Sequence, residues 1–294
     1  MGDDFAAGFG SLGGTTLVNK LKTYEEVSGY KVPLRNDLLF ADVCRTSGFM
    51  PELLSEVLGE EVSYVEDVSS QNTIPNFQES EGQVKSIRLD VFMKADGRVV
   101  NVEIQNRSHD HMARRVRYYS SAIDIRYFPN AASIDYDLPD TCVVVFYNAS
   151  VSGTSQFLER YRTVSDDGNV LDDGRNIVFI DYRQRYGYES TYLEAVCSLL
   201  RDEVDTANTK HMEVVSVMND IMANEVERRN IEKYNENMRE ERAEGRAEGR
   251  DEERVRIVLH MFSQGNLPEE ISRLTMLPIE AVNEILETYR WQLP

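Results

Sequence analysis

The chain has 294 residues, of which 41% are hydrophobic and 28% charged, and its formal net charge is −19 at pH 7. That length allows one sizeable domain with appendages or two small domains. The acidic balance argues against a general nucleic-acid binder, because contacts with phosphates need cations. The longest apolar stretches are far too short to span a membrane, and the N-terminus lacks the pattern of a secretory signal.

The cysteines indicate the compartment. Cys44, Cys142 and Cys197 are odd in number, widely separated and set among apolar residues. This pattern is typical of buried free thiols in a reducing environment. We therefore expect a cytoplasmic protein, and the lack of any Cys-x-x-Cys pair argues against a structural zinc site.

The chain begins with a segment whose composition predicts little structure. Residues 1–16 are rich in glycine, alanine and serine, and we expect residues 1–33 to form a flexible leader. Apolar residues then recur at helical spacing over residues 34–58. Gly48 and Pro51 are expected to divide that stretch into two helices.

Two strand-like runs follow, at residues 85–94 and 99–105, and a short turn separates them. The turn contains Asp96 and Gly97, and Asp-Gly between alternating apolar residues is the strongest short-range signal of a hairpin. The sequence therefore predicts an antiparallel hairpin whose register is set by this turn.

Polar side chains share one face of the predicted hairpin. Counting outward from the turn places Asp90 directly opposite Glu103, with Cβ atoms roughly 5 Å apart. Alternation puts Gln105 on the same face, opposite Arg88. Like charges opposite each other destabilise a sheet, whereas a shared Mg²⁺ reverses that penalty because it prefers carboxylate oxygens. The alternative is a pair of ordinary exposed strand residues. The apolar neighbours are expected on the opposite face, in the core: Leu89, Val91, Val102 and Ile104.

The elements after the hairpin predict an α/β domain. Residues 110–126 have the spacing of a helix with one apolar stripe, and the run 141–147 is typical of a buried strand. A further strand is expected at 176–182, and helices at 191–200 and 206–222 complete the domain. A strand, a helix and a parallel strand in this order imply a right-handed crossover.

The C-terminal part is expected to be helical. Residues 223–256 are mostly charged and indicate a linker helix, either a solvated spacer or a coiled-coil or regulatory segment. Residues 257–294 predict a small helix-turn-helix-like module. Its second helix carries glutamates and no basic residue before Arg290, so packing or dimerisation is favoured over reading of DNA bases. A homodimer through these helices is compatible with this pattern, and a DNA-binding regulator is a third reading of the same segment.

The spacing Asp-x12-Glu-x-Gln after a hairpin resembles that of the PD-(D/E)XK nucleases. The similarity is closest to the branch of PD-(D/E)XK nuclease family transposases, which is related to the Rpn recombination-promoting nucleases. It extends over residues 34–180, and Gln105 replaces the family's lysine, as in the transposase branch. Four motifs carry the resemblance: Asn36-Asp37-x-x-Phe40, Arg88-Leu89-Asp90-Val91, Asn101-Val102-Glu103-Ile104-Gln105-Asn106 and Arg114-Arg115-x-x-Tyr118-Tyr119-Ser120-Ser121.

The resemblance implies a restriction-endonuclease-like core within residues 34–222, followed by the helical extension. It also implies a DNA endonuclease that depends on Mg²⁺ or Mn²⁺. The metal ligands would be Asp90, Glu103 and the backbone carbonyl of Ile104, with water and a phosphate oxygen completing the shell. Asp37 would bind the metal through water, or would simply be an acidic residue at a helix N-terminus.

The resemblance also implies roles for the neighbouring residues. Gln105 cannot act as a cation, so it would orient the nucleophilic water while the metal or Arg88 stabilises charge. Arg115 and Tyr119 are four residues apart and can point together from one helix face. Arg114 and Arg115 would contact phosphate and Tyr119 would pack or orient, the alternative for the tyrosine being an ordinary core aromatic.

Local charge favours DNA as the partner in spite of the acidic total. Basic residues are concentrated directly after the predicted site, against only Asp110 and Asp124. The sequence thus favours a metal-dependent endonuclease. The alternative is a nuclease fold with weak or no activity that acts as an assembly or defence adaptor through its helical tail. The basic residues are Arg107, His109, His111, Arg114, Arg115, Arg117 and Arg126.

Overall fold

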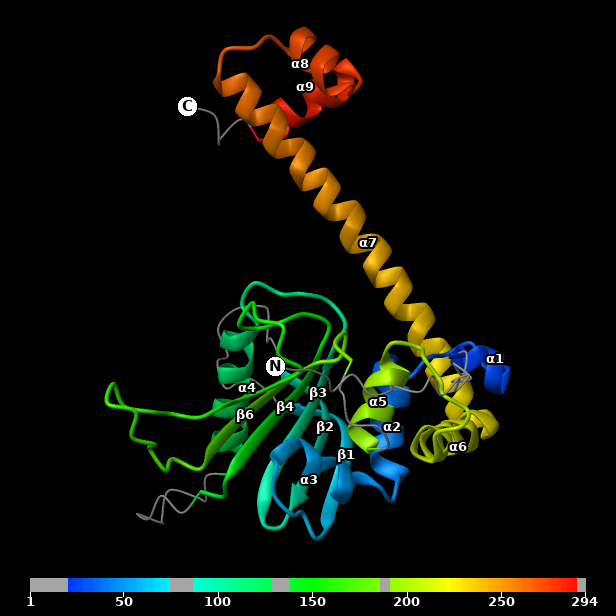
Figure 1. Cartoon of the computed structure of the whole chain (residues 1–294). Helices are drawn as coiled ribbons and strands as arrows, with labels where there is room; N and C mark the ends of the chain where they lie inside the picture. The colour runs from blue at the N-terminus through cyan, green and yellow to red at the C-terminus, as the bar shows by residue number, and fades with distance from the viewer. Residues whose placement is uncertain (1–20, 75–86, 128–137, 186–190, 290–294) are drawn as a thin grey trace, which may run out of the picture. The chain divides into compact units, whose positions relative to one another are not determined.

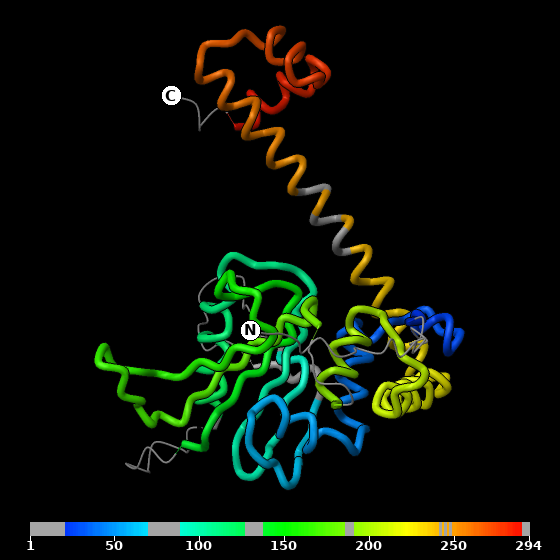
Figure 2. Tube along the Cα trace, in the orientation of Figure 1, coloured from blue at the N-terminus to red at the C-terminus, as the bar shows by residue number. Residues whose placement is uncertain are grey.

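A computed structural model describes residues 21–74, 87–127, 138–185 and 191–289 (Figure 1). Figure 2 draws the remaining residues in grey, so most of the expected leader lies outside the described residues. The chain divides into two compact units, residues 1–231 and 232–294.

The first unit is built on one six-stranded mixed sheet of order β1-β2-β3-β4-β6-β5. β1, β2 and β3 are antiparallel, β3, β4 and β6 run parallel, and β5 closes the far edge antiparallel to β6. Every residue of β4 is buried, as expected for a parallel strand covered on both faces. The strands are β1 (Val65–Ile74), β2 (Ile87–Ala95), β3 (Arg98–Gln105), β4 (Thr141–Tyr147), β5 (Leu158–Tyr161) and β6 (Arg175–Asp181).

The hairpin predicted from the sequence is confirmed with its register. Ala95 pairs with Arg98, and the ladder continues to the pair formed by Val91 and Val102. Asp96 and Gly97 both have positive φ, 48° and 82°, which the tight hairpin turn demands. Aspartate and glycine tolerate positive φ better than most residues, so the Asp-Gly dipeptide was a reliable signal of the hairpin turn.

Local signals place the helices of the first unit. Asn36 begins α2, because its side-chain oxygen accepts a hydrogen bond from the Leu39 N–H at 2.9 Å. Gly59 ends α3 in the left-handed conformation, and a Cβ there would lie 3.1 Å from the guanidinium of Arg160. The helices are α1 (Tyr24–Ser28), α2 (Asp37–Thr46), α3 (Met50–Leu58), α4 (Met112–Tyr127), α5 (Tyr192–Leu200) and α6 (Thr209–Ala223).

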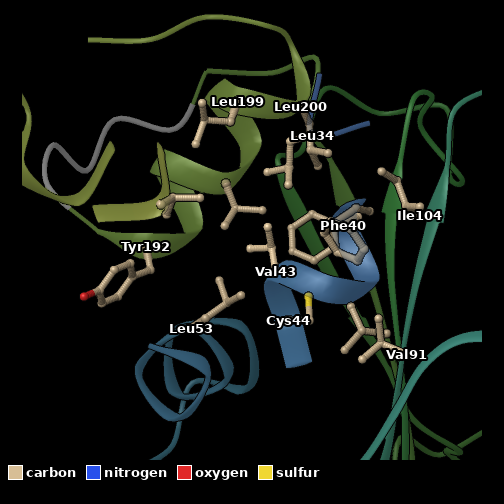
Figure 3. Packing of buried hydrophobic residues seen from close by; sticks show 14 of the residues in the cluster. Leu34, Phe40, Val43, Cys44, Leu53, Val91, Ile104, Tyr192, Leu199 and Leu200 are labelled. Atoms are coloured by element: carbon tan, nitrogen blue, oxygen red, sulfur yellow. The ribbon is translucent and has the colours of Figure 1, made fainter. Parts of the chain in front are cut away.

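Helices cover both faces of the sheet (Figure 1). One apolar cluster joins α2, α3, α5 and α6 to one face, and a second joins α4 to the other. Figure 3 shows the first cluster, in which Phe40 and Cys44 of α2 lie between Leu199 of α5 and the strand residues Val91 and Ile104. This arrangement is the restriction-endonuclease-like α/β core expected from the sequence.

The expectation that residues 1–33 form a flexible leader was wrong for its last part, because α1 lies within that range. Tyr24 is only 1% exposed, and its hydroxyl donates to Asn219 at 2.9 Å. Thr23 and Glu26 form a capping box at the start of α1. The Thr-x-x-Glu pattern was visible in the sequence, but a five-residue helix is too short to show apolar periodicity.

The second unit contains the C-terminal part of α7 (Glu225–Ser263), α8 (Pro268–Thr275) and α9 (Ile279–Thr288). Its small core consists of Val258, Ile271 and Val282. Met276 has a φ of 59° and makes the tight turn between α8 and α9. Among the helices of the described residues, none is long and apolar enough to cross a membrane.

Candidate active site

The candidate site forms where β2 and β3 stop pairing through their backbones. Beyond the pair of Val91 and Val102, side-chain carboxylates accept the hydrogen bonds that link the two strands. The Asp90 N–H donates to Oε1 of Glu103 at 3.1 Å, and the Ile104 N–H donates to Oδ2 of Asp90 at 3.0 Å. Each carboxylate therefore accepts a bond from the opposite strand, which satisfies N–H groups that the ladder no longer pairs. The structure thus brings the two acidic residues together across the hairpin.

The alternation of side chains is broken at this point. Val91 packs in the cluster under α2, as expected, but Leu89 packs with Phe92 in the cluster under α4. The expectation that Leu89 and Val91 share a face was therefore wrong. Period-two alternation holds only along a regular strand, and the strand is irregular around Asp90, where its ladder with β3 ends.

Glu103 is a buried carboxylate whose surroundings disfavour its ionised form. It is 3% exposed, and burial raises its pKa well above the ordinary value, as does the charge of Asp90. A hydrogen bond from Nδ2 of Asn101 at 2.9 Å, the Asp90 N–H and the charge of Arg115 act in the opposite direction without cancelling the rise. A cation would stabilise a buried carboxylate that lies beside a second, half-buried one.

The donor set of the pair fits a divalent cation. Mg²⁺ is commonly held by one or two carboxylates, with waters and substrate phosphates filling the other positions. Asp90 and Glu103 supply two hard carboxylates. No third acidic residue, histidine or cysteine of the described ranges joins them in a metal-binding group, and Asp37, the half-buried first residue of α2, is not brought into one.

Gln105 is tied to helix α4. Its Oε1 accepts a hydrogen bond from Nη1 of Arg115 at 3.0 Å, and its Nε2 donates to the carbonyl of Arg107 at 3.1 Å. Arg115 in turn donates from Nε to the hydroxyl of Tyr119 at 2.6 Å. Burial raises the pKa of Tyr119 to about 12, as does the nearby charge of Glu103, so the phenol stays neutral at physiological pH. The expectation that Arg115 and Tyr119 point together from one face is confirmed.

Among the described side chains, that of Arg114 makes no hydrogen bond to this group. Arg114 is exposed on α4. Arg88 lies on β2 opposite Thr73 of β1, and its side chain is outside the described part of the structure. The backbone thus places Arg88 beside the site, while its proposed contact with Gln105 stays a prediction.

Asn101 belongs to the site and was not predicted. It is fully buried and donates to Glu103, and its Oδ1 accepts no hydrogen bond from any of the described residues. Alternation along β3 places Asn101 on the same face as Glu103, two residues earlier. An asparagine between the apolar residues Val100 and Val102 was therefore a signal that could have revealed it.

The basic segment lies beside the site, in the turn before α4 and along its exposed face. Arg107, Arg114, Arg117 and Arg126 are exposed, and none of the ion pairs found in the described chain involves them. His109 and His111 lie in the turn that precedes α4, which begins two residues later than predicted, at Met112. Exposed arginines without ion-pair partners form a local positive surface on an acidic protein.

Comparison with known proteins identifies the family. The family model described as PD-(D/E)XK nuclease family transposase matches residues 38–247, which is more than half of the chain and includes β2, β3 and α4. No curated protein and no solved structure matches the chain. The chain belongs to the family of PD-(D/E)XK nuclease family transposases.

Proposed function

We propose that this protein is a metal-dependent DNA endonuclease of the transposase or recombination-promoting type. The family indicates a nuclease, and PD-(D/E)XK nucleases generally use divalent metals and act on DNA. The observation that carries the proposal is the pair of carboxylates, Asp90 and Glu103, held together where β2 and β3 separate. The like charge of Asp90 raises the pKa of the buried Glu103, and a divalent cation between the two carboxylates would offset this repulsion.

Asp90, Glu103 and the backbone carbonyl of Ile104 would hold Mg²⁺ or Mn²⁺, and Asp37 remains a candidate for a contact through water. A bound divalent cation supplies an activated water and stabilises charge on the phosphate. Hydrolysis joins the water oxygen to phosphorus and breaks one P–O ester bond, and the departing oxygen takes the proton. Asn101 keeps Oε1 of Glu103 oriented through its hydrogen bond.

Gln105 would orient the water. Its amide nitrogen carries two hydrogens, and one of them donates to the Arg107 carbonyl, which leaves the second for a water molecule. Arg88, Arg114 and Arg115 would contact DNA phosphates. Tyr119 would hold Arg115 in place through its hydroxyl.

The second candidate is a nuclease fold with weak or no activity. It would act through its C-terminal helices, either as an assembly or defence adaptor or by forming a homodimer. Apolar side chains exposed on the second unit favour it: Leu267 is 62% exposed, Leu274 59% and Met276 91%. Under this reading residues 223–256 serve as linker and 257–294 as the contact module. Both candidates place the protein in the cytoplasm, since Cys44, Cys142 and Cys197 are buried free thiols.

Plasmid nicking with Mg²⁺ or Mn²⁺ tests the nuclease. We expect wild type to cleave, and Asp90→Asn and Glu103→Gln to lose cleavage while keeping their fold, because both changes remove charge and preserve shape. Asp110→Asn, an exposed acid in the turn before α4, is the matched control and should cleave like wild type. Equal cleavage by all variants would indicate a contaminant, and no cleavage by wild type would favour the adaptor.

A further inference from the structure

Helix α4 brings a positively charged side chain, Arg115, to Gln105 at the candidate site. We propose that Arg115 takes the place of the lysine that Gln105 replaces, and that Gln105 positions it. This inference rests on the proposed nuclease function and identifies which residue of that site stabilises the negative charge on the phosphate.

Three contacts fix the Arg115 side chain. Nη1 donates to Oε1 of Gln105 at 3.0 Å, and Nε donates to the hydroxyl of Tyr119 at 2.6 Å. The guanidinium carbon lies 5.2 Å from the centre of the Tyr119 ring, within the range of a cation–π contact. Tyr119 is only 6% exposed and packs in the cluster under α4, so it is a rigid support. A guanidinium held on two of its edges retains donors for a phosphate oxygen.

The held cation lies at the reaction site and not merely on the surface. Gln105 is two residues after Glu103 on β3, so a group bonded to its amide is next to the carboxylate pair. Arg115 also interacts electrostatically with Glu103. The guanidinium of Arg115 therefore lies where the ammonium group of a lysine at position 105 would lie, although Arg115 belongs to α4 and not to β3.

The neighbouring arginines show that this arrangement is specific to one residue. Arg114 and Arg117 lie on the same helix but are exposed, and no hydrogen bond from either guanidinium occurs within the described residues. Arg115 is half-buried. Arg114 is therefore suited to a solvent-exposed phosphate contact, whereas Arg115 is preorganised before any substrate arrives.

The pairing also accounts for glutamine at position 105. A lysine there would place a second cation against the guanidinium, and like charges at hydrogen-bond distance repel strongly in a partly buried site. The amide oxygen of Gln105 accepts a bond from Arg115 and adds no charge. Glutamine and arginine thus form one functional unit, and replacing either alone should damage it.

Steady-state cleavage by the full-length chain tests the inference. Arg115→Ala should lower kcat about 100-fold, the loss typical for a missing transition-state donor, with KM nearly unchanged. Gln105→Ala and Tyr119→Phe should each lower kcat less, since each removes one support of the guanidinium. Arg114→Ala removes an exposed phosphate contact from the same helix, so it is the comparison variant and should act mainly on KM. The double variant Gln105→Lys/Arg115→Ala should recover at least about tenfold of the lost kcat, because the cation returns from β3.

A binding measurement without cleavage completes the test. Fluorescence anisotropy of a labelled DNA duplex in Ca²⁺ should show little loss of affinity for Arg115→Ala. Arg114→Ala should weaken binding and reduce the salt slope by ~1. Circular dichroism melting checks that every variant is folded. The inference about Arg115 is overturned if Arg115→Ala behaves like Arg114→Ala in both assays, or if the double variant recovers none of the lost kcat. Neither result would contradict the proposed nuclease function. If folded wild type does not cleave, the nuclease function itself fails.

Discussion

The buried carboxylate of Glu103, beside the charge of Asp90, should make the metal-free protein less stable as pH rises. Glu103 is 3% exposed, and burial together with Asp90 raises its pKa. The folded state therefore holds a proton that the unfolded chain, with an ordinary pKa near 4.3, has already lost. Stability follows the difference in bound protons, so it falls as pH rises from the unfolded pKa toward the raised folded value. The contribution of Glu103 is thus favourable at low pH and lost toward alkaline pH.

Glu103→Gln removes this penalty without changing shape. The amide oxygen can still accept the hydrogen bonds from the Asp90 N–H and from Asn101. Each unit by which the pKa is raised corresponds to about 1.4 kcal/mol once the group is ionised. Buried carboxylates beside a like charge are commonly shifted by two or more units, so we expect the variant to be more stable than wild type by about 3 kcal/mol near pH 8. The gain should shrink toward pH 5.

Urea unfolding in EDTA, followed by circular dichroism at about pH 5.5 and about pH 8, measures this difference. Glu61→Gln changes an exposed glutamate in the same unit and should leave stability unchanged at both values. Added Mg²⁺ should stabilise wild type and not Glu103→Gln, because only the wild type retains both ligands. A variant less stable than wild type near pH 8 would refute the argument from burial and like charge.

Two further predictions concern the scaffold. Gly59→Ala should destabilise the protein by about 1–2 kcal/mol in thermal melting, because its φ is +77° and the new Cβ would meet the Arg160 guanidinium at 3.1 Å; unchanged melting would contradict the need for glycine. Glu194→Gln should lower stability by about 1 kcal/mol near pH 7. Burial alone would raise the pKa of Glu194, but the hydrogen bond with His211 at 2.7 Å lowers it, so this contribution is present above the ordinary carboxyl pKa and is lost as pH falls below it. Urea titrations that show the same difference at about pH 3 and about pH 7 would exclude it.

Regular elements and their order could be predicted from the sequence because their signals are local. The apolar spacing of residues 34–58, divided at Gly48 and Pro51, predicted two helices, which are α2 and α3. The β-branched run 141–147 predicted the buried strand β4. The boundary of the leader could not be predicted, because Tyr24 is ordered by contacts with Asp202 and Asn219, nearly 200 residues away.

The sequence by itself determined the hairpin, its register and the meeting of Asp90 with Glu103. The reason is that positive φ at Asp96 and Gly97 and alternation along two short strands depend only on neighbouring residues. Only the tertiary structure decided how the strands separate around Asp90 and which side chain reaches Gln105. Arg115 meets it because α4 packs on the sheet through its own apolar face, and no local pattern specifies the distance between a helix and a strand that it covers.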